Sequence, residues 1–332
     1  MGQTYTAACK TGRGQMELRE FQVPSPGRDE LLIRIDRAAI CGSDLHAIFD
    51  GIGFLAGDDA APQPGSPGHE GVGIVEKAGR ATGFRPGDHV LVLSIGSYAE
   101  LMVAPAAQCV KLAPDAPLDT MVMAQQLGVT HYAMRRFCPE PGADGTAAVI
   151  GAGSIGLNFL QLLRLRGFER VIVSDVSRAR LKLAELLGAD TVVLAPEESV
   201  VEAIMDATGG AGADLTVEAA GYDTTRSQAI LGVRTLGRVG LFGYPETTAG
   251  SSPLPYADAF WKAPVSIEVV KGAQEVECLP DFHAAIELIS SGTVSVDHLL
   301  GTEFPLADIQ PALQAARNRD AIKVQLRPGT TR

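Results

Sequence analysis

The sequence predicts an α/β protein of two domains, and three observations support that prediction. With 332 residues, the chain is longer than one typical hydrophobic core requires. Short β-branched runs separated by proline and glycine clusters fill residues 1 to about 117. From residue 146 onward, strand-like and helix-like segments alternate, which is typical of a doubly wound parallel sheet.

The first domain is predicted from its β-branched runs. Five of them are expected to be strands, namely residues 30–40, 71–79, 88–94, 98–105 and 109–114. Stretches rich in proline and glycine separate these runs, and residues 50–68 are expected to form a loop. Apolar side chains then recur on one side of residues 119–137, which predicts a helix there.

The second domain is predicted from the alternation of strand and helix patterns. Strands are expected at residues 146–153, 170–176, 190–194, 213–221, 238–245 and 266–272, and helices at residues 154–167, 177–188, 197–210 and 223–237. The tail is expected to hold helices near 281–291 and 306–318 and a strand at 322–328, and to return to the first domain. The predicted domains are therefore residues 1–120 with 275–332, and residues 121–274.

Composition argues against several classes of partner. The chain has 28 Lys and Arg against 39 Asp and Glu, a net charge of −11, so nucleic acid and anionic membranes would be repelled. Glycines and polar side chains interrupt the longest apolar stretch, residues 147–167, and we expect no membrane span. Five scattered cysteines predict free thiols in a reducing compartment, and hence a cytoplasmic protein.

A glycine-rich turn between the first strand and first helix of the second domain indicates a nucleotide site. Gly151, Gly153 and Gly156 form the pattern G-x-G-x-x-G, with Ser154 and Ile155 at the start of the helix. The first glycine permits a tight turn, the second lets backbone approach a pyrophosphate, and the third lets the helix pack on the strand. The helix N-terminus favours the phosphates.

An acidic residue at the end of the next strand distinguishes between the two nicotinamide dinucleotides. Asp175 lies about 24 residues after Gly151 and can accept hydrogen bonds from both ribose hydroxyls, whereas it would repel a 2′-phosphate. NAD is therefore predicted, although the nearby Arg178 and Arg180 keep NADP open. Further candidate cofactor contacts follow later strands of this domain: Ala220, Gly221, Phe242 and Gly243.

Two polar clusters in the first domain indicate a transition metal. The segment CGSDLH, residues 41–46, stands where a predicted strand ends, and His69 with Glu70 precede another strand. A thiolate from Cys41 and an imidazole from His69 are ligands that suit zinc.

The order and spacing of these motifs resemble those of the zinc-containing medium-chain alcohol and polyol dehydrogenases over nearly the whole chain. The matching stretches are AAICGSDLH, PGHEGVGIV, PGDHV, SYAE, GAGSIG with Asp175, LFGYP and FPLADIQPALQAA. The resemblance implies a GroES-like β-rich catalytic domain and a Rossmann doubly wound parallel-sheet domain, with the active site in the cleft between them. The ligand pattern is most similar to sorbitol, threonine and glucose dehydrogenases.

The resemblance implies that Cys41 and His69 bind one catalytic zinc ion and that Asp44 orients the metal ligands. The remaining ligand of the polyol dehydrogenases is a Glu, and Gln125 stands in its position here. The resemblance extends to the archaeal glucose dehydrogenases, which also use a Gln there, beside an adjacent His-Glu pair. Glu70 would then be a ligand or an exchanging neighbour, and which of the two persists is left open. The family's lobe of four cysteines is missing between LSIG and SYAE, so no structural zinc is expected.

The resemblance further implies that Ser43 and His46 relay the proton of an alcohol to solvent through the cofactor ribose. A hydroxyl and an imidazole are suited to proton transfer. The leading hypothesis is an NAD-dependent zinc enzyme that interconverts a secondary alcohol of a polyol, sugar or small biosynthetic intermediate and its ketone. A zinc-free quinone or enoyl reductase and a redox-inactive nucleotide-binding protein are the alternatives.

The expected partners are a small alcohol or ketone and further copies of the chain. Residues 265–272 resemble the segment through which family members pair, and an exposed β edge is otherwise an aggregation liability. A homodimer or homotetramer is therefore expected. The stretch GIGFLAG, with Phe54 and Leu55, suggests a partly apolar wall of the substrate pocket.

Overall fold

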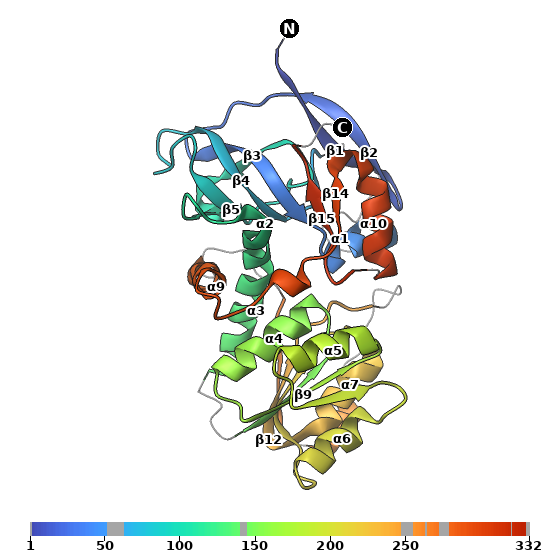
Figure 1. The fold of residues 1–332 in the computed structure, drawn as a ribbon. Coiled ribbons are helices and arrows are strands. Elements are labelled where there is room, and N and C mark those ends of the chain that lie inside the picture. Colours follow the sequence, from blue (N-terminus) through green and yellow to red (C-terminus); the bar gives the residue numbers. More distant parts are fainter. Residues whose placement is uncertain are drawn as a thin grey trace. The chain divides into compact units, whose positions relative to one another are not determined.

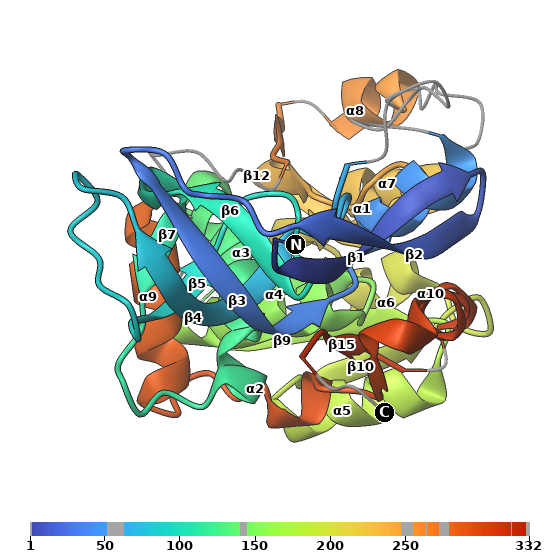
Figure 2. The same cartoon turned by 90° about the horizontal axis from the view of Figure 1, so that it is seen from above.

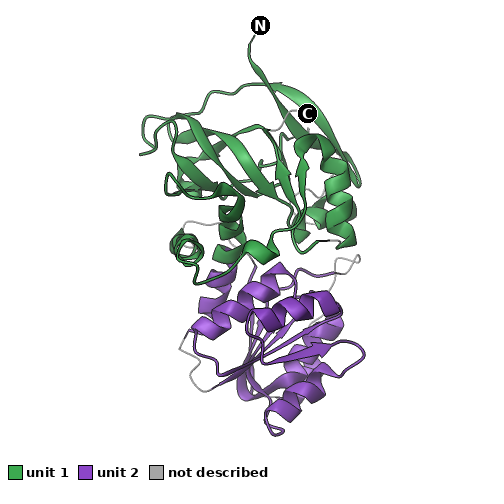
Figure 3. Ribbon diagram, viewed as in Figure 1, with its two compact units in different colours: residues 1–128, 274–332 green, residues 129–273 purple. Residues whose placement is uncertain are grey.

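The computed structural model describes residues 2–51, 63–139, 145–246, 255–262, 264–271, 279–319 and 321–329. The chain forms two compact units, residues 1–128 with 274–332 and residues 129–273 (Figure 3). The boundary at residue 128 falls inside helix α3 (Met123–Phe137). Throughout the described ranges, no helix is both long and apolar enough to cross a membrane.

Unit 1 is built mainly of β-strands. They are β1 (Thr4–Gly12), β2 (Gln15–Gln22), β3 (Glu30–Ala39), β4 (Glu70–Ala78), β5 (His89–Val92), β6 (Leu101–Pro105), β7 (Cys109–Lys111), β14 (Glu303–Pro305) and β15 (Gln325–Arg327). Figure 1 shows the main sheet, whose order is β14-β15-β3-β4-β5-β7 with β6 pairing on β3. Strands β1 and β2 form a separate antiparallel hairpin. In Figure 2, β3, β4 and β5 run side by side, as their antiparallel pairing requires.

The helices of unit 1 are short, and one of them closes the core of the sheet. They are α1 (Gly42–Leu45), the π-helical turn η1 (His46–Asp50), η2 (Ala106–Gln108), α2 (Leu118–Met121), α9 (Leu279–Ser290), η4 (Asp297–Leu299), η5 (Leu306–Asp308) and α10 (Ile309–Asn318). Leu31, Ile33 and Ile35 of β3 are fully buried and belong to one core with Leu313 of α10. The consecutive residues Leu31, Leu32 and Ile33 are all buried, so both faces of this part of β3 are covered, whereas Arg34 is exposed.

Unit 2 alternates strands and helices along its whole length. Its strands are β8 (Thr146–Ile150), β9 (Arg170–Asp175), β10 (Thr191–Leu194), β11 (Ala213–Glu218), β12 (Val233–Leu241) and β13 (Ser266–Val269). Its helices are α4 (Ser154–Leu165), α5 (Arg178–Leu186), α6 (Val200–Ala207), α7 (Asp223–Gly232) and α8 (Tyr256–Lys262). The strands form one parallel sheet in the order β10-β9-β8-β11-β12-β13.

The strand order of unit 2 fixes where a ligand would bind. Right-handed crossovers place α4 and α5 on one face of the sheet and α6 and α7 on the other. The chain therefore reverses its direction of winding between β8 and β11. Ligands of doubly wound sheets bind at this reversal, outside the carboxyl ends of the strands.

The two-domain α/β prediction is confirmed, but several elements differ from it, and α1, η1, α8 and β14 were not predicted. The helix expected over residues 119–137 is two helices, α2 and α3, with Val122 between them. The helix expected to reach residue 237 ends at Gly232, because Val233 pairs with Ala213 and begins β12. Strands β1 and β2 were not predicted individually, since β2 is mostly exposed and its polar sequence lacks a β-branched run.

Candidate functional site

Strand pairing brings the two polar clusters of unit 1 together. β3 ends at Ala39, directly opposite Glu70, the first residue of β4. The chain then passes through Cys41, whose extended backbone stands at the N-terminal cap of α1. His69 immediately precedes β4, so one strand end and one strand start place a thiol, an imidazole and a carboxylate side by side.

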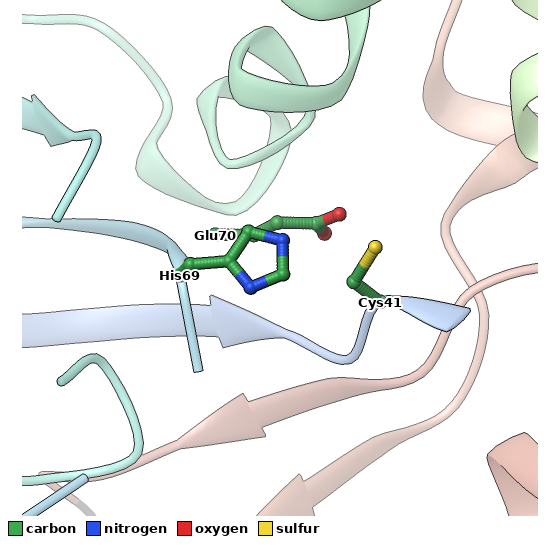
Figure 4. Close-up of side chains that lie close together, drawn as sticks. All are labelled: Cys41, His69 and Glu70. Carbon is green, nitrogen blue, oxygen red and sulfur yellow. The ribbon is translucent and has the colours of Figure 1, made fainter. Parts of the chain in front are cut away.

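Cys41, His69 and Glu70 form a cluster of the size that one metal ion requires. One ligand atom from each lies within 4.8 Å of the other two. Two ligands of one zinc ion are at most about 4.6 Å apart, because each bond is about 2.0–2.3 Å long. Figure 4 shows the Cys41 sulfur, an imidazole nitrogen of His69 and the Glu70 carboxylate turned toward a common region.

Asp44 is fully buried and connects the ligands of this cluster. Its Oδ2 accepts hydrogen bonds from the Cys41 amide at 3.0 Å and the Tyr98 hydroxyl at 2.5 Å. Its Oδ1 lies 2.9 Å from Nδ1 of His69. Burial alone would lower the pKa of His69, but the carboxylate of Asp44 and the thiol of Cys41 raise that pKa well above its usual value. With Nδ1 held by Asp44, Nε2 is the ring atom that can face a metal.

A buried lysine adds a positive charge beside the cluster. Nζ of Lys323 lies 2.5 Å from Oε2 of Glu70, and both side chains are almost fully buried. Burial alone would lower the pKa of Lys323, but Glu70, Cys41 and Asp44 raise it, so this residue stays an ammonium. In the state that binds a metal, Cys41 is a thiolate and His69 is neutral, so three anions and one ammonium leave a charge of −2, which a divalent cation neutralises. The donor set and its charge therefore fit zinc.

Three other predicted site residues lie in the same unit. The Ser43 hydroxyl donates to the Cys41 sulfur at 3.3 Å, so it lies beside the candidate metal centre. His46 belongs to the π-helical turn, and its Nδ1 lies 2.9 Å from Oδ2 of Asp50. Gln125 is buried near the start of α3. The predicted wall residues Phe54 and Leu55 lie outside the described residues.

The glycine-rich turn of unit 2 has the geometry that a dinucleotide needs. Gly151 adopts a φ of +104°, which favours glycine, and a Cβ there would lie 3.0 Å from Ala220. A Cβ on Gly153 would meet no protein atom within 4 Å, so this position is open to a ligand. A Cβ on Gly156 would lie 1.8 Å from the Gly151 carbonyl oxygen. Ser154 and Ile155 are the first residues of α4. Their amides belong to the N-terminal, positive end of the helix dipole, which attracts phosphate.

Asp175 connects this turn to the next one. Its Oδ2 accepts a hydrogen bond from the Ala152 amide at 2.7 Å, and its Oδ1 accepts one from the Ser177 amide at 2.8 Å. Nη1 of Arg180 lies 3.9 Å from Oδ2, while Arg178 forms an ion pair with Glu197. The carboxylate is thus fixed at the end of β9, and each of its oxygens retains a lone pair for a ribose hydroxyl.

Glu218 accepts hydrogen bonds from all four remaining candidate cofactor residues, which follow β11 and β12. Its buried carboxylate accepts hydrogen bonds from the amides of Ala220 at 2.8 Å and Gly221 at 2.6 Å. Its carbonyl oxygen accepts from the amides of Phe242 and Gly243, both at 3.0 Å. Burial raises the pKa of Glu218 although these donors to its carboxylate lower it. Ala220 and Gly221 therefore follow β11, the neighbour of β8 at the reversal of the sheet, and Phe242 and Gly243 follow β12, one strand further along.

Tyr98 and Lys323 were missed by sequence reasoning. Tyr98 lies within the SYAE stretch, but nothing local indicates that its hydroxyl reaches Asp44, 54 positions away. Lys323 stands two residues before Gln325, the first residue of β15, and two buried polar side chains at alternate positions of this apolar segment could have indicated a site.

Comparisons with known proteins match most of the chain. A model of the alcohol dehydrogenase GroES-like domain matches residues 27–115, and a zinc-binding dehydrogenase model matches residues 154–291. An L-threonine 3-dehydrogenase of Pyrococcus horikoshii is 31% identical over 74% of this chain and 78% of its own length. An erythritol/L-threitol dehydrogenase of Mycolicibacterium smegmatis is 29% identical over 96% of each. The structure of an alcohol dehydrogenase from Thermus sp. ATN1 has a TM-score of 0.83 and 25% identity, covering 97% of this chain and 99% of that one.

Proposed function

This chain belongs to the zinc-type alcohol and polyol dehydrogenase family, and we propose that it interconverts a secondary alcohol and its ketone with NAD and one zinc ion. The convergence of Cys41, His69 and Glu70 within 4.8 Å supports the proposal most strongly. Relatives named for threonine, erythritol and sorbitol favour a polyol, a sugar or a small biosynthetic intermediate as substrate. The described cysteines form no disulfide bond, consistent with the proposed cytoplasmic location.

In this proposal Cys41 and His69 hold the zinc ion, together with Glu70 or Gln125. Zinc bound there supplies Lewis-acid chemistry at the substrate oxygen. The Lys323 ammonium binds the Glu70 carboxylate. Glu70 can therefore be a zinc ligand only if its carboxylate contacts zinc and Lys323 together or gives up its contact with Lys323. Gln125 is neutral and would leave the charge balance of the cluster unchanged.

Ser43 and His46 are the proposed proton carriers. The Ser43 hydroxyl lies next to the Cys41 sulfur, where it can accept the proton of an alcohol held at the cluster. His46 follows on the next helical turn, half-buried, with Nδ1 directed at Asp50. In the proposed relay the proton passes from Ser43 along the cofactor ribose to His46 and from there to solvent.

Replacing Asp175 by Ser is expected to raise the use of NADP relative to NAD about tenfold or more. The substitution removes the charge that repels a 2′-phosphate and the acceptors for the ribose hydroxyls, each worth about 1 kcal/mol or more. Steady-state kcat/KM for both cofactors measures the change. Asp175→Asn keeps one acceptor but no charge, so its preference between NADP and NAD should lie between those of the wild type and Asp175→Ser. Equal efficiency of the wild-type enzyme with both cofactors would contradict the assignment.

We expect the protein to be at least a homodimer in solution. β13 stands at the edge of the unit 2 sheet, with Val269 74% exposed. The rings of Phe260 and Trp261 on α8 are also exposed. An apolar edge of this kind is an aggregation liability unless another chain covers it. Light scattering at micromolar concentration checks the prediction, and a monomer would contradict it.

A substrate panel, with zinc measured on the same sample, tests the proposed function. Polyols, sugars and small secondary alcohols are supplied with NAD, and NADH formation is followed by absorbance. We expect turnover of at least one class and one zinc ion per chain. Two zinc ions would contradict the single site. Turnover of quinones or enoyl compounds without zinc would instead indicate a reductase, and nucleotide binding without any turnover would indicate a redox-inactive protein.

A further inference from the structure

Tyr98 is a fully buried residue that reaches the candidate metal cluster through Asp44. Its side chain is fully buried in the segment between β5 and β6. Its backbone carbonyl accepts from the Ala8 amide at 2.9 Å, and its amide donates to the Gly65 carbonyl at 3.1 Å. A Cβ on Gly68 would lie 2.4 Å from the Tyr98 ring, so the residue before His69 must be small. The ring is therefore held from several sides.

The Tyr98 hydroxyl donates a short hydrogen bond to a carboxylate that has no contact with water. The distance to Oδ2 of Asp44 is 2.5 Å, in the range of charge-assisted O–H···O⁻ bonds. The other donor to Oδ2 is the Cys41 amide at 3.0 Å, and Oδ1 lies 2.9 Å from Nδ1 of His69. Tyr98, Asp44 and His69 thus form a connected chain that ends at the cluster.

We propose that Tyr98 is a positioning residue that fixes the Asp44 carboxylate and thereby aims Nε2 of His69 at the metal. The inference rests on the proposed zinc function. Two donors on Oδ2 prevent the carboxylate from rotating, so Oδ1 is always presented to Nδ1 of His69. Groups that orient a metal-bound histidine in this way contribute to metal affinity. Tyr98 acts one contact further from the metal than Asp44 does.

The protonation state of Tyr98 suits this role. Burial raises its pKa well above the usual value, and the adjacent charge of Asp44 raises it further. The hydroxyl therefore stays protonated, and so remains a donor, to a higher pH than an exposed tyrosine would. A tyrosine that served only to fill the core would gain nothing from its hydroxyl, since a buried hydroxyl without a partner is destabilising. A phenylalanine at this position separates the two roles because it keeps the ring.

The test compares the zinc affinity of wild-type protein, Tyr98→Phe and Tyr5→Phe. Tyr5 is a matched control, a buried tyrosine of the same unit that packs on Phe21. Each protein is stripped of metal, and its zinc dissociation constant is measured by competition with a chelator. Tyr98→Phe should bind zinc about 10-fold more weakly, within the range known for such supporting groups. Tyr5→Phe should match the wild type.

A double-mutant cycle separates positioning from general loss of stability. In an Asp44→Asn background, Tyr98→Phe should lower zinc affinity by less than about twofold, because the carboxylate it fixes is gone. Additive losses, or a Tyr98→Phe protein that binds zinc as tightly as the wild type, would overturn the inference and leave the proposed function standing. A wild-type protein that takes up no zinc would overturn both.

Discussion

Replacing Ser43 by Ala is expected to lower turnover about 100-fold or more, the usual scale of general acid–base assistance. The Ser43 hydroxyl lies 3.3 Å from the Cys41 sulfur, so it is within reach of a substrate oxygen held at the cluster. Alanine keeps the helical turn of α1 but offers no group to accept the proton. Zinc content and NADH binding should stay unchanged. Stopped-flow measurement of hydride transfer, with elemental analysis of the same sample, gives both quantities.

Two further variants sharpen this result. Ser291→Ala, at an exposed position after α9, makes the same chemical change far along the chain and should turn over normally. His46→Gln should have a smaller effect than Ser43→Ala, because solvent can replace the later carrier of a proton relay. The proton-transfer role is wrong if either active-site variant loses its metal. It is also wrong if Ser43→Ala turns over at the wild-type rate when hydride transfer limits the reaction.

Replacing Lys323 by Met is expected to destabilise the metal-free protein by about 3–5 kcal/mol, the typical result of breaking a buried ion pair. The variant leaves the buried Glu70 carboxylate without the ammonium that lies 2.5 Å away. Zinc would restore positive charge beside Glu70, so the zinc-loaded variant should lose less stability. Unfolding by denaturant with and without zinc measures both values, and the stabilisation gained on adding zinc should be larger than in the wild type.

Lys111 provides a matched control for this prediction. Its Nζ lies 2.7 Å from Asp88 on the surface, and exposed pairs of this kind contribute at most about 1 kcal/mol. Lys111→Met should therefore cost much less than Lys323→Met. Equal losses in the two variants, or the same loss of Lys323→Met with and without zinc, would show that Glu70 does not depend on a nearby positive charge.

Much of the fold was predictable because its signals are local. Gly151, Gly153 and Gly156 are close in sequence, and the close contacts that a side chain would make at Gly151 and Gly156 explain why glycine is required. The alternation of strands and helices in unit 2 likewise follows from the residue pattern of each successive segment. The end of α7 was misjudged because Gly232 is followed by residues that become a strand only through pairing with β11.

The candidate site was predictable in part for the same reason. Cys41, Ser43 and His69 stand out as chemically active types at strand ends, and the structure places Cys41 and His69 with Glu70. Tyr98 and Lys323 reach the cluster only through the register of strands distant in sequence. No local pattern specifies that register, so their contacts with Asp44 and Glu70 had to come from the structure.

X-ray absorption at the zinc edge tests the central claim most directly, since it reports which atoms surround the metal. For zinc-loaded wild-type protein we predict one sulfur ligand at about 2.3 Å and nitrogen or oxygen ligands at about 2.0–2.2 Å. In a Cys41→Ser variant the sulfur ligand should disappear. A spectrum with several sulfur ligands, or a sulfur ligand that persists in Cys41→Ser, would contradict a zinc centre built on Cys41 and His69.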